Sequence, residues 1–326
     1  MHIQKEDLNE LEFPELLAEI SPFAFSKKIA DKIATIRPFK LEEAELSLKK
    51  VAEYLSSFES DNAIPFNEYE DIEAELKLML IDNFRLDNAA FLKIKSLTEQ
   101  IARLQKFYPV YDDLFLHLNN DVKDLEYRKE IIDKIDKVFN RFGEVKSEAS
   151  PLLKTLRSEI SQAKKAIQEN FNRALTALSS TDFLDDIRES IVDDQRVLAV
   201  KSGYKKRVAG RVLGLSKTGS ITYIQPESVV KHQFKLREDI EEEKKEVDKI
   251  LRKLTFEISE FQPQLFDYQK YIFDLDVTRA KAKFAEKIDG VLPKINHHRT
   301  MRLVNAFHPL LLIRNKEEQK KIYPQT

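Results

Sequence analysis

The chain has 326 residues, of which 34% are charged and 42% hydrophobic, and its formal net charge is −2. This length allows two or more cores, and the near-zero net charge gives no overall attraction to nucleic acid, so any attraction must come from local segregation of charge. The lack of cysteine excludes disulfides, thiolate metal sites and cysteine nucleophiles, and it fits a cytoplasmic location. No stretch approaches 18 apolar residues and the N-terminus does not resemble a signal peptide, so we expect no membrane segment.

Residues 1–124 carry several amphipathic patterns that predict a helical core. The clearest patterns lie at 41–58, 69–80 and 88–107, where apolar residues recur at steps of three and four. Residues 263–300 contain a further helical pattern and are assigned to the same core.

Two long helical patterns follow, and they are separated in the sequence by residues 183–227. The first lies within 125–182, with Ser150 as the expected N-cap and Pro151 at the first helical position. The second lies within 228–262 and has heptad spacing, in Val247, Leu251, Leu254, Ile258 and Phe261. An antiparallel pair would bury both apolar stripes, so we expect one helix to leave the body of the protein and the other to return.

The region between these helices, 183–227, predicts a small antiparallel sheet. Its apolar residues alternate, and glycine-bearing joints at 202–204 and 217–220 indicate hairpin turns. The window 195–226 contains no Asp or Glu, so its cations are candidates for contact with phosphate groups. The candidate nucleic-acid-binding residues are Lys201, Lys205, Lys206, Arg207, Arg211 and Lys217. The alternative is that these lysines lie on a solvent-exposed edge of the sheet, where their charge prevents edge-to-edge aggregation. Tyr204 and Tyr223 would stack on bases or cap the sheet.

The last segment, 301–326, is typical of a different domain. Residues 301–313 alternate and then become apolar, which predicts a strand, and the chain ends before such a domain would be complete.

A search for catalytic patterns gives no candidate. The glycines do not form a phosphate loop followed by Gly-Lys-Ser/Thr, and no serine lies in a Gly-x-Ser-x-Gly context. The pair His297-His298 has no third ligand at a suitable spacing. We therefore assign no catalytic, cofactor-binding or metal-binding residue to these 326 residues.

Motifs of one family occur along nearly the whole chain. They are Leu11–Phe13, Arg37–Pro38, Gly143–Val145, Ala149–Pro151, Leu156–Arg157, Arg196–Lys201, Tyr204, Arg207–Val208, Gly210, Val212, Ser216, Gly219, Ile224, Pro226 and His308–Leu311. Together they resemble the MutS family, and in particular its second bacterial branch, whose members carry a C-terminal Smr nuclease domain. Three departures stand out: the family usually has an acid at the position of Gln225, an Asn-Asn pair at the position of Gln233-Phe234, and a Ser-x-Ser-Gly turn where this chain has Ser216-Lys217-Thr218-Gly219.

The resemblance implies a mainly α fold, in which a helical core carries a long antiparallel two-helix lever with a small antiparallel β clamp. It also implies that the full-length protein is a homodimer that binds ATP and Mg²⁺ and acts as an ATPase and endonuclease. The implied targets are branched or recombination DNA, or collided ribosomes. Residues 308–311 would open the ATPase domain, so no catalytic residue is transferred to this chain.

Two functions from different classes therefore remain open. The first is a nucleic-acid-binding clamp and lever, and the alternative is a structural coiled-coil module that only dimerises or binds other proteins. Because the family dimer is built largely through the ATPase domains, this segment alone is expected to be monomeric or weakly dimeric.

Overall fold

The computed structural model describes residues 5–58, 62–296, 298, 300–318 and 320. It divides into two compact units, one formed by Met1–Ile135 with Thr255–Thr326 and the other by Asp136–Leu254. The first unit is helical, and the second contains a four-stranded antiparallel sheet. The prediction of a mainly helical protein with one small antiparallel sheet is thus confirmed. None of the described helices is both long and apolar enough to cross a membrane.

The first unit is built around helix α11 (Gln262–Lys287), which packs against five other helices. These are α2 (Phe13–Ile20), α3 (Lys27–Ala34), α4 (Leu41–Ser56), α5 (Glu73–Leu78) and α6 (Asn88–Phe107). The remaining helices are α1 (Lys5–Glu10), α7 (Leu116–Lys123), α8 (Lys129–Val138) and α12 (Pro309–Glu317), with 3-10 turns η1 (Ser21–Phe23) and η2 (Tyr108–Tyr111).

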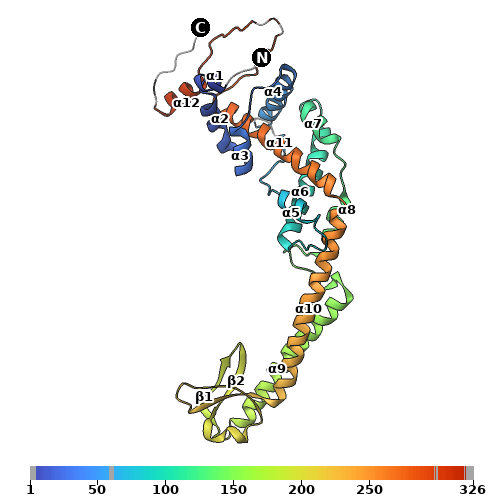
Figure 1. The fold of residues 1–326 in the computed structure, drawn as a ribbon, viewed down its shortest axis with the longest axis vertical. Helices are drawn as coiled ribbons and strands as arrows, with labels where there is room; N and C mark the ends of the chain where they lie inside the picture. Colours follow the sequence, from blue (N-terminus) through green and yellow to red (C-terminus); the bar gives the residue numbers. More distant parts are fainter. Residues whose placement is uncertain (1–4, 59–61, 297, 299, 319, 321–326) are drawn as a thin grey trace. The chain divides into compact units, whose positions relative to one another are not determined.

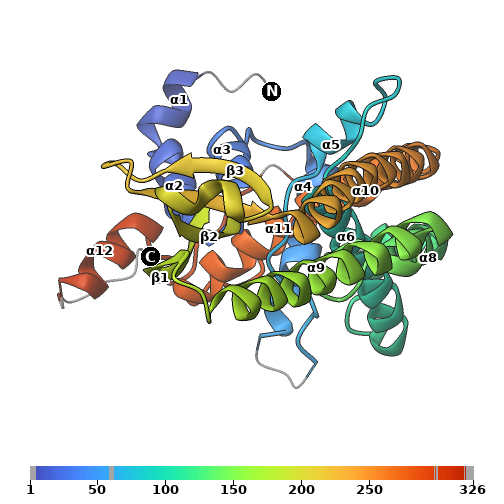
Figure 2. The ribbon, with the colours of Figure 1, turned by 90° about the horizontal axis from the view of Figure 1, so that it is seen from below.

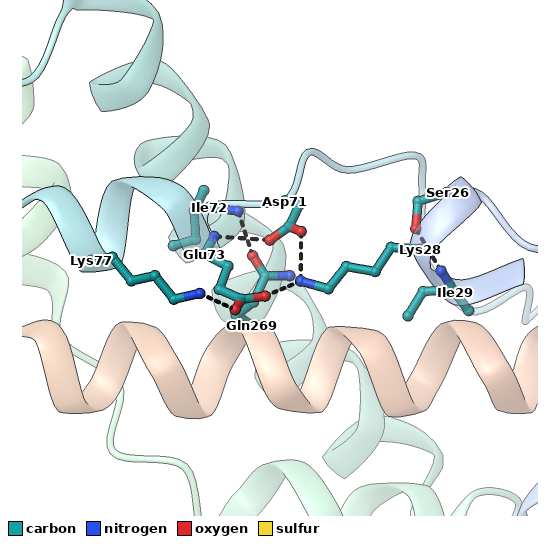
Figure 3. A network of polar contacts seen from close by, with 8 residues as sticks. All are labelled: Ser26, Lys28, Ile29, Asp71, Ile72, Glu73, Lys77 and Gln269. Atoms are coloured by element: carbon teal, nitrogen blue, oxygen red, sulfur yellow. Dashed lines mark hydrogen bonds and ion pairs between the residues drawn. The ribbon is translucent and has the colours of Figure 1, made fainter. Parts of the chain in front are cut away.

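Buried polar groups fix α11 against the N-terminal segments. Asp276 is fully buried; it accepts hydrogen bonds from the Phe25 amide (3.0 Å) and the Tyr69 hydroxyl (2.9 Å). Figure 3 shows a second link, in which the Ile72 amide donates to Gln269 Oε1 (2.8 Å). A buried polar group without a partner would cost roughly 1–3 kcal/mol, so these bonds fix one packing arrangement.

Exposed charges in the same network join α3 to α5. Lys28 of α3 pairs with Asp71 (2.8 Å) and with Glu73, and Lys77 also pairs with Glu73 (2.6 Å), as Figure 3 shows. Lys28 and Lys77 hold the pKa of Glu73 down, to about 2. Surface pairs of this kind contribute little individually, so they support the packing rather than determine it.

The prediction of a strand at 301–313 was wrong. Residues 309–317 form α12, with Pro309 in its first turn, and Ile313 is buried beside Leu17 and Ile20 of α2. A short apolar run does not distinguish a strand from a buried helical turn, and here the contact with α2 favours the helix.

The second unit contains the two long helices predicted from the sequence. They are α9 (Pro151–Leu178) and α10 (Glu227–Ser259), and α10 extends past the boundary of the unit. Ser150 caps α9 by accepting from the Leu153 amide (3.0 Å), as predicted.

The pairing of α9 with α10 is antiparallel. Ile160 and Ala163 of α9 pack with Leu236 of α10 in one apolar cluster. Ion pairs join Glu159 to Lys235 (2.7 Å) and Arg157 to Glu243 (2.7 Å), so position rises on α10 as it falls on α9. The helix pair is therefore fixed in register by both apolar and charged contacts.

The strands are β1 (Leu184–Val192), β2 (Gln195–Lys201), β3 (Gly210–Leu215) and β4 (Ile221–Pro226). Their order in the sheet is β1-β2-β4-β3, and every pair of neighbouring strands is antiparallel. Figures 1 and 2 show the strands of this sheet in green to yellow. One face packs Leu198, Val200 and Ile224 against Phe171 of α9 and Val229 of α10. Phe171 thus joins the sheet to the helix pair.

The sheet curls until its two edges approach each other. Val192 of β1 lies 3.9 Å from where a Cβ on Gly214 of β3 would be, although β1 and β3 are opposite edges. Irregular register at 184–189 and at 212–214 adds to the natural twist. As a result, Val197 and Ala199 on the second face are also buried.

One of the two predicted hairpin turns was wrong. Residues 217–220 do form the tight turn between β3 and β4, but 202–204 belong to a 3-10 segment, η4 (Ser202–Arg207). Because β4 lies between β2 and β3, the chain must cross over rather than turn back at this point. Local sequence does not reveal the strand order that imposes this crossover.

Candidate nucleic-acid interface

The crossover segment η4 presents three consecutive cations, and it is anchored on both sides of them. Before them, the Tyr204 ring stacks on Phe183 with centroids 4.9 Å apart, and both rings pack on the sheet cluster. After them, Val208 is buried in that cluster. Of the two roles considered for Tyr204, the structure shows packing on the sheet.

The three cations of η4 are exposed between these anchors. Lys205 and Lys206 have no ion pair within the part of the chain that the structure describes. The Arg207 guanidinium lies 5.7 Å from the centroid of the Phe183 ring. Their side chains can therefore donate hydrogen bonds to an anion without first breaking an ion pair with a carboxylate.

The other predicted cations are not gathered at the same place. Lys201 is opposite Ile221 and Arg211 is opposite Gln225, so they lie at two ends of β4, about 13 Å apart along the strand. Lys217 is exposed in the β3–β4 turn. The structure thus brings together Lys205, Lys206 and Arg207 and distributes the remaining three over the sheet.

Two cations of this region have acidic partners that lie before the acid-free window. Lys201 pairs with Asp182 (2.8 Å), and this hydrogen bond raises the pKa of Lys201 above its ordinary value. Arg196 pairs with Glu189 and lies over the Phe171 ring (4.2 Å). The absence of acids in 195–226 therefore did not mean that all of its cations lack partners.

The beginning of α10 adds residues that the sequence reasoning did not select. Phe234 is 50% exposed, and the Arg211 guanidinium lies 6.0 Å from its ring centroid. Gln233 and Arg237 border the same shallow depression. A signal was present in the sequence, because Phe234 stands in the polar, charged part of the helix and departs from the family's Asn-Asn pair.

The described residues contain no group of three or more His, Asp or Glu side chains placed to hold a metal ion. His297, considered above as a metal ligand, lies outside the described residues. The expectation that this segment contributes no catalytic residue remains a prediction.

In a comparison with known proteins, the chain is similar to several bacterial proteins that carry the same name. No protein-family model matches the chain. It is 26% identical over 325 residues to the Endonuclease MutS2 of Aquifex aeolicus (strain VF5), and 27% identical over 320 residues to that of Geobacillus thermodenitrificans (strain NG80-2). It is 25% identical over 313 residues to the Putative endonuclease MutS2 of Bacillus subtilis (strain 168). Each match covers 95% of this chain and 40% of the relative, so the chain spans about two fifths of the curated relatives' length.

Proposed function

Because this chain is a homologue of the MutS2 proteins over nearly its whole length, we propose that it is the clamp and lever part of a MutS-like protein that binds nucleic acid. The clamp is the sheet with η4, and the lever is the pair α9 and α10. The observation that carries the proposal is the exposed set Lys205, Lys206 and Arg207, which form no ion pair with any residue that the structure describes and lie on a segment anchored at both ends.

The proposed mode of binding is contact with the phosphate backbone. Lysine and arginine contacts to phosphate are independent of sequence, and each releases counterions from the nucleic acid. An anchored segment also loses less conformational freedom on binding than a mobile loop would, which favours affinity.

The proposed mechanical role of the lever rests on how the sheet is joined to the helices. Phe171 of α9 and Val229 of α10 pack in the same cluster as the sheet, and ion pairs fix the register between the helices. A displacement of the sheet would therefore move α9 and α10 together.

The remaining activities would lie in the part of the relatives that this chain does not span. There we place ATP and Mg²⁺ binding, ATP hydrolysis, endonuclease activity and the main homodimer contacts of the full-length protein. Branched or recombination DNA and collided ribosomes both remain as targets, because both present phosphate backbones to the clamp, and a cytoplasmic location suits either.

The test is charge reversal of the three η4 cations, K205E/K206E/R207E. Three phosphate contacts contribute a salt slope of about −2.7, which is about a 40-fold loss of affinity between 50 and 200 mM salt. Binding of duplex DNA, branched DNA and ribosomes would be measured across this range for wild type and variant. We expect the variant to bind more weakly and with a shallower slope.

A matched control separates local from overall charge. K154E/K164E/K165E makes the same change in net charge on exposed positions of α9. Equal loss of binding in both variants, or an unchanged affinity and slope in the η4 variant with native circular dichroism, would contradict the proposal. The structural coiled-coil module would then be the better description.

A further inference from the structure

An exposed aromatic ring lies beside two arginines where β3 begins and α10 makes its first turns. Phe234 is 50% exposed, whereas Val229 and Leu236 of the same helix are buried in the apolar clusters. Arg211 approaches the ring to 6.0 Å, and Arg237 follows three residues after Phe234 on α10, about one turn along. The ring is therefore not needed to fill either cluster.

The position of Arg211 is built into the sheet. A Cβ on the preceding Gly210 would lie 2.1 Å from the Gln225 carbonyl oxygen, so only glycine lets β3 start this close to β4. Arg211 is paired with Gln225, which is 2% exposed and donates to Gln195 Oε1 (2.8 Å). A buried, hydrogen-bonded partner thus holds the strand that carries this cation beside the ring.

Both arginines are available to an anion. Neither Arg211 nor Arg237 forms an ion pair with any residue that the structure describes. The depression that they border with Phe234 has a volume of about 10 Å³, which is too small for a nucleobase. A ligand must therefore lie on the ring rather than enter a pocket.

Acidic residues next to this place disfavour a continuous duplex. Asp193 and Asp194 form the β1–β2 turn with positive φ of 46° and 58°, immediately before Gln195. Their carboxylates would repel the closely spaced phosphates of a duplex backbone. A single unpaired base meets less of this repulsion, because the base is uncharged and a single strand carries about half as many phosphates per unit length as a duplex.

We propose that Phe234 is a stacking platform for one unpaired base, with Arg211 and Arg237 binding the phosphates on either side of it. This inference rests on the proposed function and narrows its ligand to nucleic acid that contains single-stranded or unstacked nucleotides. Stacking on an aromatic ring accepts any base, so the site selects structure and not sequence.

The test compares Phe234→Ala with wild type on defined probes. These are a labelled 12-nucleotide oligo-dT, the matching oligo-rU and a blunt DNA duplex of the same length. Loss of one stacked base should weaken single-strand binding about 5- to 150-fold. Duplex binding, which depends on the η4 cations, should change less than twofold. Oligo-dT and oligo-rU should lose affinity alike, since the base face and phosphate are common to both.

Three further measurements make the result specific. Phe234→Tyr keeps the ring and should restore binding, and Phe256→Ala, which removes another exposed phenylalanine of α10 (70% exposed), should have no effect. A 2-aminopurine placed within the single strand should change fluorescence on binding to wild type and Phe234→Tyr, but not on binding to Phe234→Ala.

The outcomes distinguish this inference from the function on which it rests. If wild type binds duplex and single strand and Phe234→Ala changes neither affinity nor 2-aminopurine fluorescence, the stacking platform is refuted while the clamp proposal stands. If wild type binds none of these probes, the stacking platform is refuted, and the clamp proposal is decided separately by the measurements on branched DNA and ribosomes; Phe234 is then better viewed as a contact for another protein. If Phe234→Ala weakens the binding of oligo-rU but not of oligo-dT, the inference that the site contacts only the base face and the phosphates, which both probes share, is refuted.

Discussion

Phe171 is the residue whose removal should separate the stability of the sheet from that of the helical core. Its ring is fully buried (0% exposed) between α9 and the sheet, where it packs in the cluster that contains Leu198, Val200 and Ile224. Arg196 also lies over the ring at 4.2 Å. We predict that Phe171→Ala destabilises the second unit while leaving the first unit folded.

The expected magnitude follows from the burial. Truncation of a buried phenylalanine to alanine costs about 3–5 kcal/mol, and loss of the contact with Arg196 adds about 0.5–1 kcal/mol at a partly exposed site. A domain is stable by about 5–15 kcal/mol, so this is a large share of the total. For a unit of about 120 residues, at about 4 °C per kcal/mol, the sum of the two contributions lowers Tm by about 14–24 °C.

The assay is hydrogen exchange followed by mass spectrometry, combined with differential scanning calorimetry. Peptides from β2 and β4 should exchange faster in Phe171→Ala, while peptides from α6 keep their protection. Phe142→Ala is the control, because Phe142 belongs to the same unit but is 71% exposed; its effect should stay within about 0.5 kcal/mol. Unchanged protection of β2 and β4 would refute the view that Phe171 joins the sheet to the helices.

Two further predictions concern single positions. Gly210→Ala should destabilise the sheet by about 1–3 kcal/mol, because the added Cβ would lie 2.1 Å from the Gln225 carbonyl oxygen. Gly203→Ala should leave the stability unchanged, since nothing lies within 4 Å of its added Cβ. Thermal unfolding of both variants tests this pair. Lys281→Met should raise the free energy of unfolding by about 1 kcal/mol at pH 7, because burial lowers the pKa of Lys281 and its amine has no carboxylate partner among the described residues. Between the lowered pKa of Lys281 and 10.5, the unfolded chain binds more protons than the native one, so the stability of the wild type rises with pH and the advantage of Lys281→Met should shrink. Urea unfolding of both proteins at pH 7 and 9.5 measures the difference in the free energy of unfolding. A difference that stays constant between the two pH values would contradict the lowered pKa of Lys281.

Local signals in the sequence were sufficient for the long helices. Residues 88–107 were predicted as a helix, and α6 has these bounds, because Asp87 caps its start and a regular apolar stripe runs along it. Ser150 gave the start of α9 for the same reason. In both places the capping residue and the apolar period agree, so neighbouring segments do not change the outcome.

Non-local pairing decided the features that the sequence did not predict. The order β1-β2-β4-β3 converts the joint at 202–204 from a turn into a crossover, and contact with α2 makes 309–317 helical. For the candidate site, the exposure of Lys205 and Lys206 was predictable, but the partner of Lys201 was not, because Asp182 lies 19 residues earlier. Phe234 was missed because its proximity to Arg211 depends on the register of β3 with β4.

The interruption of the first unit by the second has a consequence for the order of folding during synthesis. Asp276 accepts from the Phe25 amide across 251 positions of sequence, and the sheet unit lies between them. At about 5–20 residues per second, the ribosome needs roughly 12–50 s to make that stretch. The second unit is contiguous in sequence, and all of its residues have been synthesised once Leu254 is added. It is therefore expected to fold before α11, against which Ile29 and Ile33 of α3 pack, has been made. Translation that stops before Gln262 would therefore release a folded sheet unit attached to helices that lack α11, the helix against which five of them pack.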